Sequence, residues 1–134
     1  MATSISETLA ALVRRDAAEA GFDAVGIAAP DAIAGAADRL AAFLAAGHHG
    51  TMRWMAEKAA WRADPRALWP EARSIIMLAM NYGPDADPRL GQALASRAMI
   101  SVYARNRDYH DVIKGRLKTI AGRLAAASGA PVKV

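Results

Sequence analysis

Residues 74–82 read SIIMLAMNY, and this stretch decides the fold class. Its six-residue apolar run, Ile75 to Met80, would place apolar side chains on both faces of a strand. Short runs of this kind, bounded by polar residues, are typical of strands that are covered on both sides. The sequence therefore predicts that Ile75 to Met80 form a central strand of a sheet against which helices pack.

Helices are predicted before and after this strand. Residues 4–20 have an apolar stripe at helical spacing, and Ser4 and Glu7 have the spacing of a capping box. Residues 109–127 form a second amphipathic pattern, and residues 32–46 a third. We expect the helices of residues 5–20 and 109–126 to lie against the sheet.

Shorter elements complete the pattern. Residues 22–28 predict a second strand, residues 99–104 a strand or an extended connection, and residues 131–134 the first residues of another strand. Pro65 and Pro70 should break the region between the two main strands into short helical pieces. This order of helices and strands predicts an α/β or an α+β protein, and the spacing alone does not choose between them.

Composition limits the possible functions. The chain has 134 residues, enough for one ordinary domain, and its net charge of +4 favours an anionic partner. It has no cysteine, so it can form neither a disulfide nor a cysteine-ligated cluster. No secretory signal is evident, and no apolar run approaches the roughly 20 residues of a membrane helix. We expect a cytoplasmic protein that makes no membrane contact.

The densest group of polar residues is the run RNRDYH at residues 105–110, at the predicted start of the last helix. Free backbone N–H groups and the positive end of the helix dipole favour anions and polar ligand groups there. Asp108 could cap the helix, and His110 could transfer a proton near neutral pH. A helix cap, a core tyrosine and solvated arginines would explain the same pattern without a ligand.

Two further segments have both a structural and a functional interpretation. The stretch from Arg97 to Arg123 is basic, and its Lys114 and Lys118 lie one helical turn apart. These side chains could contact RNA phosphates, or they could form an ordinary solvent-exposed helix face. Methionine and tryptophan residues between positions 52 and 61 suit either a core or an apolar wall for a flat ligand. His48 and His49 are adjacent and point in different directions, so we expect no metal site there.

Four stretches in series resemble the epoxyqueuosine reductase family. They are GFD with VGI at residues 21–27, GHHG with Met52, Trp54 and Met55 at residues 47–55, DPR and WPEARS leading through the apolar strand to Asn81-Tyr82, and ISVYAR with RDYH at residues 100–110. The last is the most specific. Their order and spacing match the family from about Gly21 to Val134.

The resemblance implies an oxidoreductase of queuosine biosynthesis, which reduces epoxyqueuosine to queuosine at the wobble position of tRNA. It implies an α+β fold with a nitroreductase-like mixed sheet flanked by helices, incomplete at its C-terminus. Cobalamin would be the reaction centre. Two 4Fe-4S clusters, held by cysteines of a later ferredoxin-like domain, would supply electrons to it, and this chain would ligate neither cluster.

On this resemblance, residues 1–134 form a single N-terminal cobalamin-binding domain that stops before the cluster domain and is inactive alone. It assigns cofactor binding to Arg105, Asp108, Tyr109 and His110, and catalysis to Asp108 and His110, although the family's proposed proton donor would lie beyond Val134. The basic stretch from Arg97 to Arg123 predicts tRNA contacts by Arg97, Lys114 and Lys118. Exposed apolar surface at Val132 and Val134 could drive self-association.

Three other interpretations stay open at this point. A flavin-binding nitroreductase-like domain would have a related fold and a different bound pigment. A non-catalytic tRNA- or RNA-binding module would use the basic last helix and need no cofactor. A remnant without function would have a poorly packed C-terminal strand.

Overall fold

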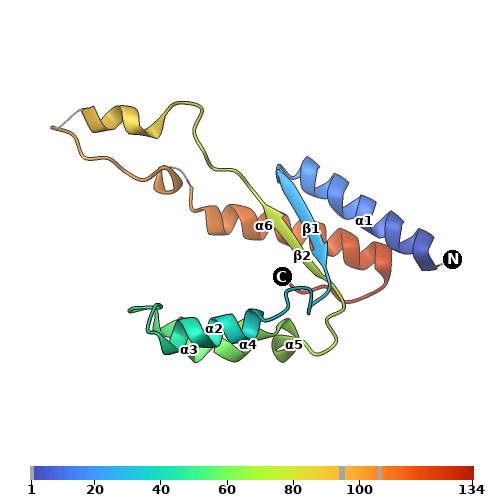
Figure 1. Ribbon diagram of the computed structural model, residues 1–134. Helices are drawn as coiled ribbons and strands as arrows, with labels where there is room; N and C mark the ends of the chain where they lie inside the picture. The colour runs from blue at the N-terminus through green and yellow to red at the C-terminus, as the bar shows by residue number, and fades with distance from the viewer. Residues whose placement is uncertain (1, 94–95, 106) are drawn as a thin grey trace. The chain divides into compact units, whose positions relative to one another are not determined.

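The computed structural model describes residues 2–93, 96–105 and 107–134, and the fold is α+β (Figure 1). Two compact units are present, one formed by Met1–Val25 with Leu78–Val134 and the other by Gly26–Met77. They are called unit 1 and unit 2. The prediction of an α+β protein is confirmed, and the α/β alternative is not needed.

Unit 1 begins with helix α1, Ala2–Glu19, which ends where glycine is required. Gly21 adopts a left-handed conformation with φ 80°, which side chains with a Cβ rarely take. Its N–H donates to the carbonyl of Ala18, and the N–H of Phe22 donates to that of Ala17, both at 2.9 Å. These two bonds form a Schellman motif, and they turn the Phe22 side chain into the core.

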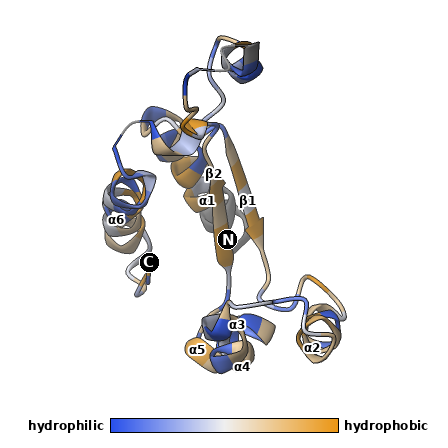
Figure 2. Ribbon diagram, turned by 90° about the vertical axis from the view of Figure 1, so that its left-hand side faces the viewer, coloured by the Kyte–Doolittle hydropathy of each residue, from blue (hydrophilic) through white to orange (hydrophobic). Residues whose placement is uncertain are grey.

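Strand β1, Ala24–Ala28, pairs with strand β2, Ile75–Ala79, in an antiparallel sheet. Both strands are largely apolar along their length (Figure 2). A hydrogen bond links the two strands just outside the paired residues: the N–H of Asn81 donates to the carboxylate of Asp23 at 2.6 Å. The predicted strands at residues 22–28 and 74–82 are therefore confirmed, with shorter limits.

The core of unit 1 lies between two helices and the strand residues of the same unit. Helix α6, Tyr109–Ser128, contributes Ile120, which is buried with Ala17 and Phe22. Partly buried side chains of both strands and of α6 pack against this cluster: Val25, Leu78, Met80, Ile113 and Leu117. The prediction that the first and last helices pack on the strands is confirmed.

The prediction that β2 is covered on both faces is wrong for the described residues. Only two strands pair there, and the Met77 side chain is 65% exposed. Successive side chains of a strand point to opposite faces, so the helices that cover Leu78 and Met80 cannot also cover Met77. The apolar run specified a strand correctly, and it overstated how much of that strand this chain buries.

Two other predicted elements differ from the structure. Residues 99–101 are irregular and Val102–Ala104 form a 3-10 helix, η2, so the strand is the wrong one of the two alternatives predicted for residues 99–104. Residues 131–134 are also irregular, since no described strand pairs with them, and an unpaired strand cannot satisfy its backbone groups. Val134 is exposed, and self-association through this end stays a prediction.

Unit 2 is helical between the two strands, as predicted. It contains α2 (Ala36–Ala45), α3 (Arg53–Glu57), α4 (Ala59–Ala63) and α5 (Pro65–Leu68), and α4 packs against α2 and α5. Helix α2 starts later than predicted because Gly35 precedes it in a left-handed conformation with φ 68°. Asp64 caps α5 by accepting the N–H of Arg66 at 2.8 Å, with Pro65 in the first turn.

One buried carboxylate joins the two long helices of unit 1. The side chain of Asp16 on α1 has no exposed surface, and its Oδ1 atom accepts a hydrogen bond from Arg15 Nη2 at 2.9 Å. Its Oδ2 atom lies 3.5 Å from Nη1 of Arg123 on α6. Chiefly through the Arg15 hydrogen bonds, the pKa of Asp16 is held below its ordinary value of 3.8. The carboxylate is thus charged, buried and shared by α1 and α6.

We predict that Asp16→Asn lowers the melting temperature at pH 7, because it leaves Arg15 and Arg123 beside an uncharged buried amide. A lowered native-state pKa stabilises the fold above the ordinary value of 3.8, and this stabilisation is lost as the pH falls through the native-state pKa. The parent should therefore lose more stability than Asp16→Asn between pH 5 and about pH 2. Thermal unfolding by circular dichroism measures both effects.

Glu19 provides the control, since it also faces Arg123 at 3.5 Å but is exposed. Glu19→Gln should change the melting temperature little, because exposed ion pairs contribute little. Equal losses in the two variants at pH 7 would contradict the role given to Asp16.

Candidate functional site

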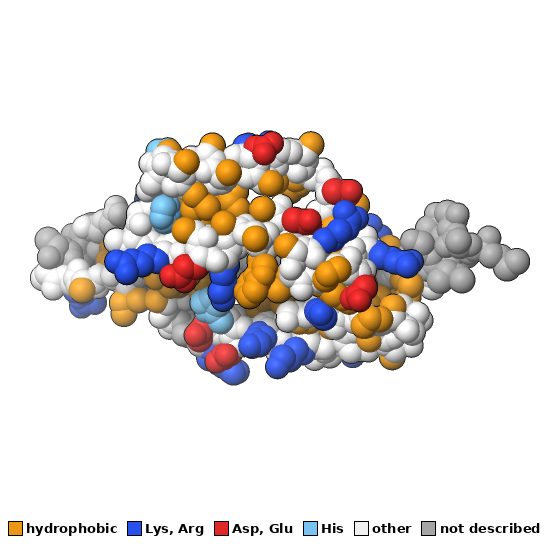
Figure 3. Space-filling view, turned by 90° about the horizontal axis from the view of Figure 1, so that it is seen from below, with side chains coloured by type: hydrophobic (Ala, Val, Ile, Leu, Met, Phe, Trp, Pro, Cys, Tyr) orange, Lys and Arg blue, Asp and Glu red, His pale blue; other side chains and the backbone are white. Residues whose placement is uncertain are grey.

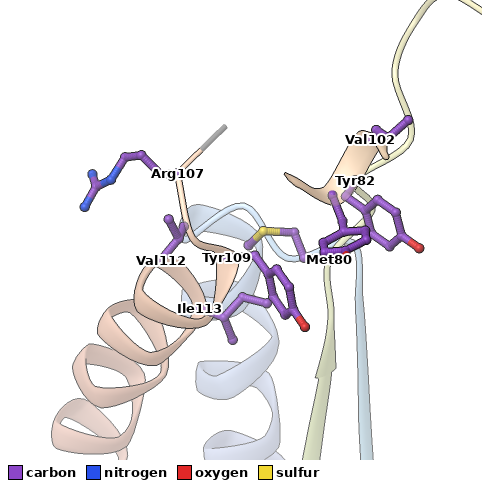
Figure 4. A pocket seen from close by; sticks show the side chains of 8 residues that line it. Met80, Tyr82, Val102, Arg107, Tyr109, Val112 and Ile113 are labelled. Atoms are coloured by element: carbon purple, nitrogen blue, oxygen red, sulfur yellow. The ribbon is translucent and has the colours of Figure 1, made fainter. Parts of the chain in front are cut away.

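Unit 1 contains a cavity of about 780 Å³ beside the start of α6 (Figure 4). Three tyrosines and one arginine stand among apolar side chains in its lining. The lining residues are Met80, Tyr82, Val102, Tyr103, Arg107, Tyr109, Val112 and Ile113.

Three segments of unit 1 converge on this cavity. Met80 and Tyr82 follow the end of β2, and Val102 and Tyr103 lie on η2. Residues 109, 112 and 113 share one face of α6, because residues three and four apart are neighbours on a helix. Ile113 also packs against the core, so the buried cluster that holds α6 also positions one wall of the cavity.

The lining combines broad apolar surface with a few polar ends. Tyr103 and Tyr109 meet edge to face, with ring centroids 6.3 Å apart and planes at 85°. Tyrosine presents an apolar ring and a hydroxyl that can donate or accept a hydrogen bond, and Arg107 adds a fixed positive charge. Such a cavity suits a flat, largely apolar ligand that carries polar groups at its edge.

Asp108 and His110 form a local pair at the first turn of α6. Oδ1 of Asp108 accepts the backbone N–H of His110 at 2.9 Å and lies 2.8 Å from its ring atom Nδ1. The backbone bond and then the ring bond lower the pKa of Asp108 from its ordinary value. An ionised Asp108 favours a proton on Nδ1 and leaves Nε2 of His110 available to exchange a proton.

The structure brings three of the four predicted cofactor-binding residues together. Tyr109 lines the cavity, and its ring stacks on that of His110 with centroids 4.1 Å apart. Asp108 and His110 lie beside this residue and are absent from the lining. Arg105 lines a different cavity of about 530 Å³, and its Nε atom donates to the carbonyl of Ile100 at 3.0 Å.

Sequence reasoning missed most of the lining. Arg107 was within the polar run but was not selected, and Tyr82 and Tyr103 were noted only as parts of motifs. A tyrosine that directly follows an apolar strand, with others just before a helix, was a usable signal, because loops at the ends of strands commonly carry ligand sites.

The three residues predicted to contact RNA are exposed, and two of them are adjacent on α6. Lys114 and Lys118 lie one turn apart, and neither pairs with a carboxylate within the described ranges. Other basic side chains of the same stretch are engaged elsewhere. Arg116 Nη1 contacts the sulfur of Met80 at 3.6 Å, and Arg123 binds Asp16 and Glu19. Fewer basic side chains of this stretch are therefore available to contact RNA than the sequence indicated.

The histidines and tryptophans of unit 2 were also considered from sequence. No three His, Asp or Glu side chains of the described residues gather at a possible metal site. His48 is exposed against the ring of Phe43, with centroids 5.5 Å apart. Trp54 and Trp61 are about half exposed, so they are not core residues of unit 2. Within the same described ranges, no helix is long and apolar enough to cross a membrane.

Comparison with known proteins gives a consistent result. Residues 62–134 match a family model described as "Epoxyqueuosine reductase QueG, DUF1730". A protein of Alicycliphilus denitrificans named epoxyqueuosine reductase is 39% identical over 120 residues, which cover 84% of this chain and 33% of that protein. Proteins of the same name from Gloeobacter violaceus and Burkholderia pseudomallei are 42% and 38% identical, covering 88% and 91% of this chain.

The chain spans about a third of the length of these curated relatives, which are covered to 33%, 35% and 34%. No solved structure matches it. The family model covers more than half of the chain, and it includes β2, η2 and all of α6, the elements that build the cavity. The chain therefore belongs to the epoxyqueuosine reductase family.

Proposed function

We propose that this chain contributes the cobalamin-binding part of an epoxyqueuosine reductase, which reduces epoxyqueuosine to queuosine in tRNA. The observation that carries the proposal is the tyrosine-lined cavity at the start of α6, formed within the segment that matches the family. The two iron–sulfur clusters implied by the family would belong to other parts of the full protein, since this chain has no cysteine.

The residues of the cavity fit a corrin. Its ring is broad and apolar, and amide side chains surround its edge. Tyr103, Tyr109 and Val112 would contact the apolar face, while the tyrosine hydroxyls and Arg107 could hydrogen-bond the amide oxygens. A volume of about 780 Å³ holds part of so large a molecule, so other segments of the full protein would complete the site.

Reductive opening of an epoxide requires electrons and a proton for the departing oxygen. When bound, the reduced corrinoid supplies the electrons. The chain's own part is positioning and proton transfer. Asp108 holds the Nδ1 edge of the His110 ring, so that Nε2 can accept a proton and, from the imidazolium form, pass it on beside Tyr109. We propose His110 as a proton-transfer residue and Asp108 as the residue that orients it.

The tRNA would be held partly by the exposed positive charges of unit 1. Arg97 and the pair Lys114 and Lys118, which are exposed, would contact phosphates, and such contacts weaken as salt rises. Arg105 is the fourth basic side chain that this proposal includes, as a ligand of the cofactor edge or of a phosphate. A tRNA-modifying role also implies a cytoplasmic location.

The cofactor proposal predicts that the chain, or a full-length relative with the same substitutions, retains cobalamin through gel filtration and shows corrinoid absorbance. Tyr109→Ala should reduce retention about tenfold, because it removes the ring at the centre of the wall. His110→Ala should reduce epoxide reduction more than cofactor retention. Asp108→Ser should share that phenotype, since serine keeps a helix cap and removes the carboxylate.

His48→Ala is the matched control, because His48 is an exposed histidine of unit 2. It should retain cofactor and activity. Flavin absorbance in place of corrinoid absorbance would contradict the proposal and favour a nitroreductase-like domain. If Tyr109→Ala and His110→Ala both keep full cofactor retention and full activity, the start of α6 is only a capped helix end.

The RNA proposal predicts that Lys114→Glu with Lys118→Glu weakens binding to tRNA about tenfold and reduces its salt dependence. Removing two phosphate contacts should lower the salt slope by about one for each contact. Filter binding at several salt concentrations measures both. Arg14→Glu with Arg39→Glu carries the same charge change on α1 and α2, and an equal loss in that control would mean that net charge alone binds the RNA.

A further inference from the structure

All three tryptophans of the chain, Trp54, Trp61 and Trp69, lie in unit 2. Trp54 is 47% exposed and Trp61 is 49% exposed. Burying these large rings would be favourable, so two half-exposed rings on neighbouring short helices are a candidate binding surface. Neither residue belongs to the cavity of unit 1.

Each of the two exposed rings carries a cation on one face. The guanidinium carbon of Arg62 lies 4.4 Å from the ring centroid of Trp54, and Nζ of Lys58 lies 5.3 Å from that of Trp61. Lys58, the N-cap of α4, and Trp61 are three residues apart, so their contact is local to the start of α4. Arg62 reaches Trp54 from α4 to α3, so this contact joins the two helices.

The surrounding surface mixes apolar and basic side chains. Arg53 on α3 adds a further positive charge, against the single acidic residue Glu57 in the two helices. Figure 3 shows one face with blue Lys and Arg side chains among orange hydrophobic ones, together with red Asp and Glu side chains. The four residues Trp54, Lys58, Trp61 and Arg62 are called the tryptophan–cation surface.

We propose that the tryptophan–cation surface binds single-stranded RNA, with the indole rings stacking on bases and Lys58 and Arg62 contacting phosphates. Proteins commonly hold unpaired bases in this way, because every base has a face that can stack on an aromatic ring. The inference rests on the proposed function, since it takes the RNA to be an unpaired loop of the tRNA substrate. It adds a second contact region, in unit 2, to the charges proposed on α6.

Lys58 favours RNA over a protein partner, whereas tryptophan and arginine are common in both kinds of interface. Lysine is depleted at the centres of protein interfaces, where a charge would have to be desolvated, whereas phosphates need such charges. Each indole also keeps about half of its surface exposed, which a stacked base would cover. The net charge of the chain, +4, attracts a polyanion to the same surface.

The test uses tryptophan fluorescence, excited at a wavelength that tyrosine does not absorb, which in this chain reports on unit 2 alone because all tryptophans lie there. The probes are an RNA hairpin with a single-stranded loop and a fully paired duplex of the same base composition. The hairpin should quench tryptophan fluorescence saturably and bind at least about fivefold more tightly than the duplex. Equal binding of the two RNAs, or hairpin binding without any change in fluorescence, would overturn the inference.

Variants assign the effect to the surface. Trp54→Ala with Trp61→Ala should weaken hairpin binding about fivefold or more, measured by anisotropy of labelled RNA, whereas Trp54→Phe with Trp61→Phe should retain most of it. Lys58→Gln with Arg62→Gln should weaken it as well. Arg39→Gln with Arg73→Gln removes the same charge from exposed positions of unit 2 and should not. Equal losses in these two glutamine pairs would overturn the inference.

The remaining outcomes are also decisive. If the alanine pair loses its helical circular dichroism signal, the glutamine pairs carry the test alone. If a full-length relative has these tryptophans shielded from acrylamide and unaffected by RNA, another part of the polypeptide covers the surface and the inference fails. Absence of hairpin binding by the parent chain also overturns it. The proposed function is judged separately, by corrinoid absorbance and by the Lys114 and Lys118 variants of unit 1.

Discussion

The contact between α1 and α6 is the constraint on which the rest of unit 1 depends. Ala17, Phe22 and Ile120 close the apolar side of this contact, and Asp16 places a buried negative charge within reach of Arg123. A buried carboxylate is tolerated only where a cation compensates it, so the pair favours one register of the two helices. Apolar packing alone would allow small shifts between them.

This register has a direct consequence for the candidate site. Helix α6 enters the core through Ile113, Leu117 and Ile120, and its first turn is therefore held at a defined distance from the end of β2. The cavity lies where these two segments and η2 meet. The loop between β2 and α6 supplies Tyr103 and Arg107, which would have no fixed position without the helix that follows them.

The two units divide the proposed work by their chemistry. Unit 1 offers a partly open, tyrosine-lined cavity next to a histidine whose ring is oriented by a carboxylate. Unit 2 offers an open surface on which aromatic rings are paired with cations. An enzyme that acts on one base of a large RNA would use both kinds of site, one for the reacting group and one for the polyanion.

Local sequence determined which segments form the helices and strands of this protein. Tertiary structure decided which of their side chains are buried and which of them meet. The apolar run at Ile75 to Met80, the stripe of α6 and the stop at Gly21 depend on neighbouring residues, so the strands and helices were predictable from pattern. Asp108 as a helix cap was predictable for the same reason. The exposure of one face of β2 was not predictable, because a strand is covered on both faces only by neighbours, and the described residues do not provide them. The lining of the cavity, the burial of Asp16 and the pairing of Arg62 with Trp54 join residues that are distant in sequence or on different helices, and no local pattern records which distant side chains will meet.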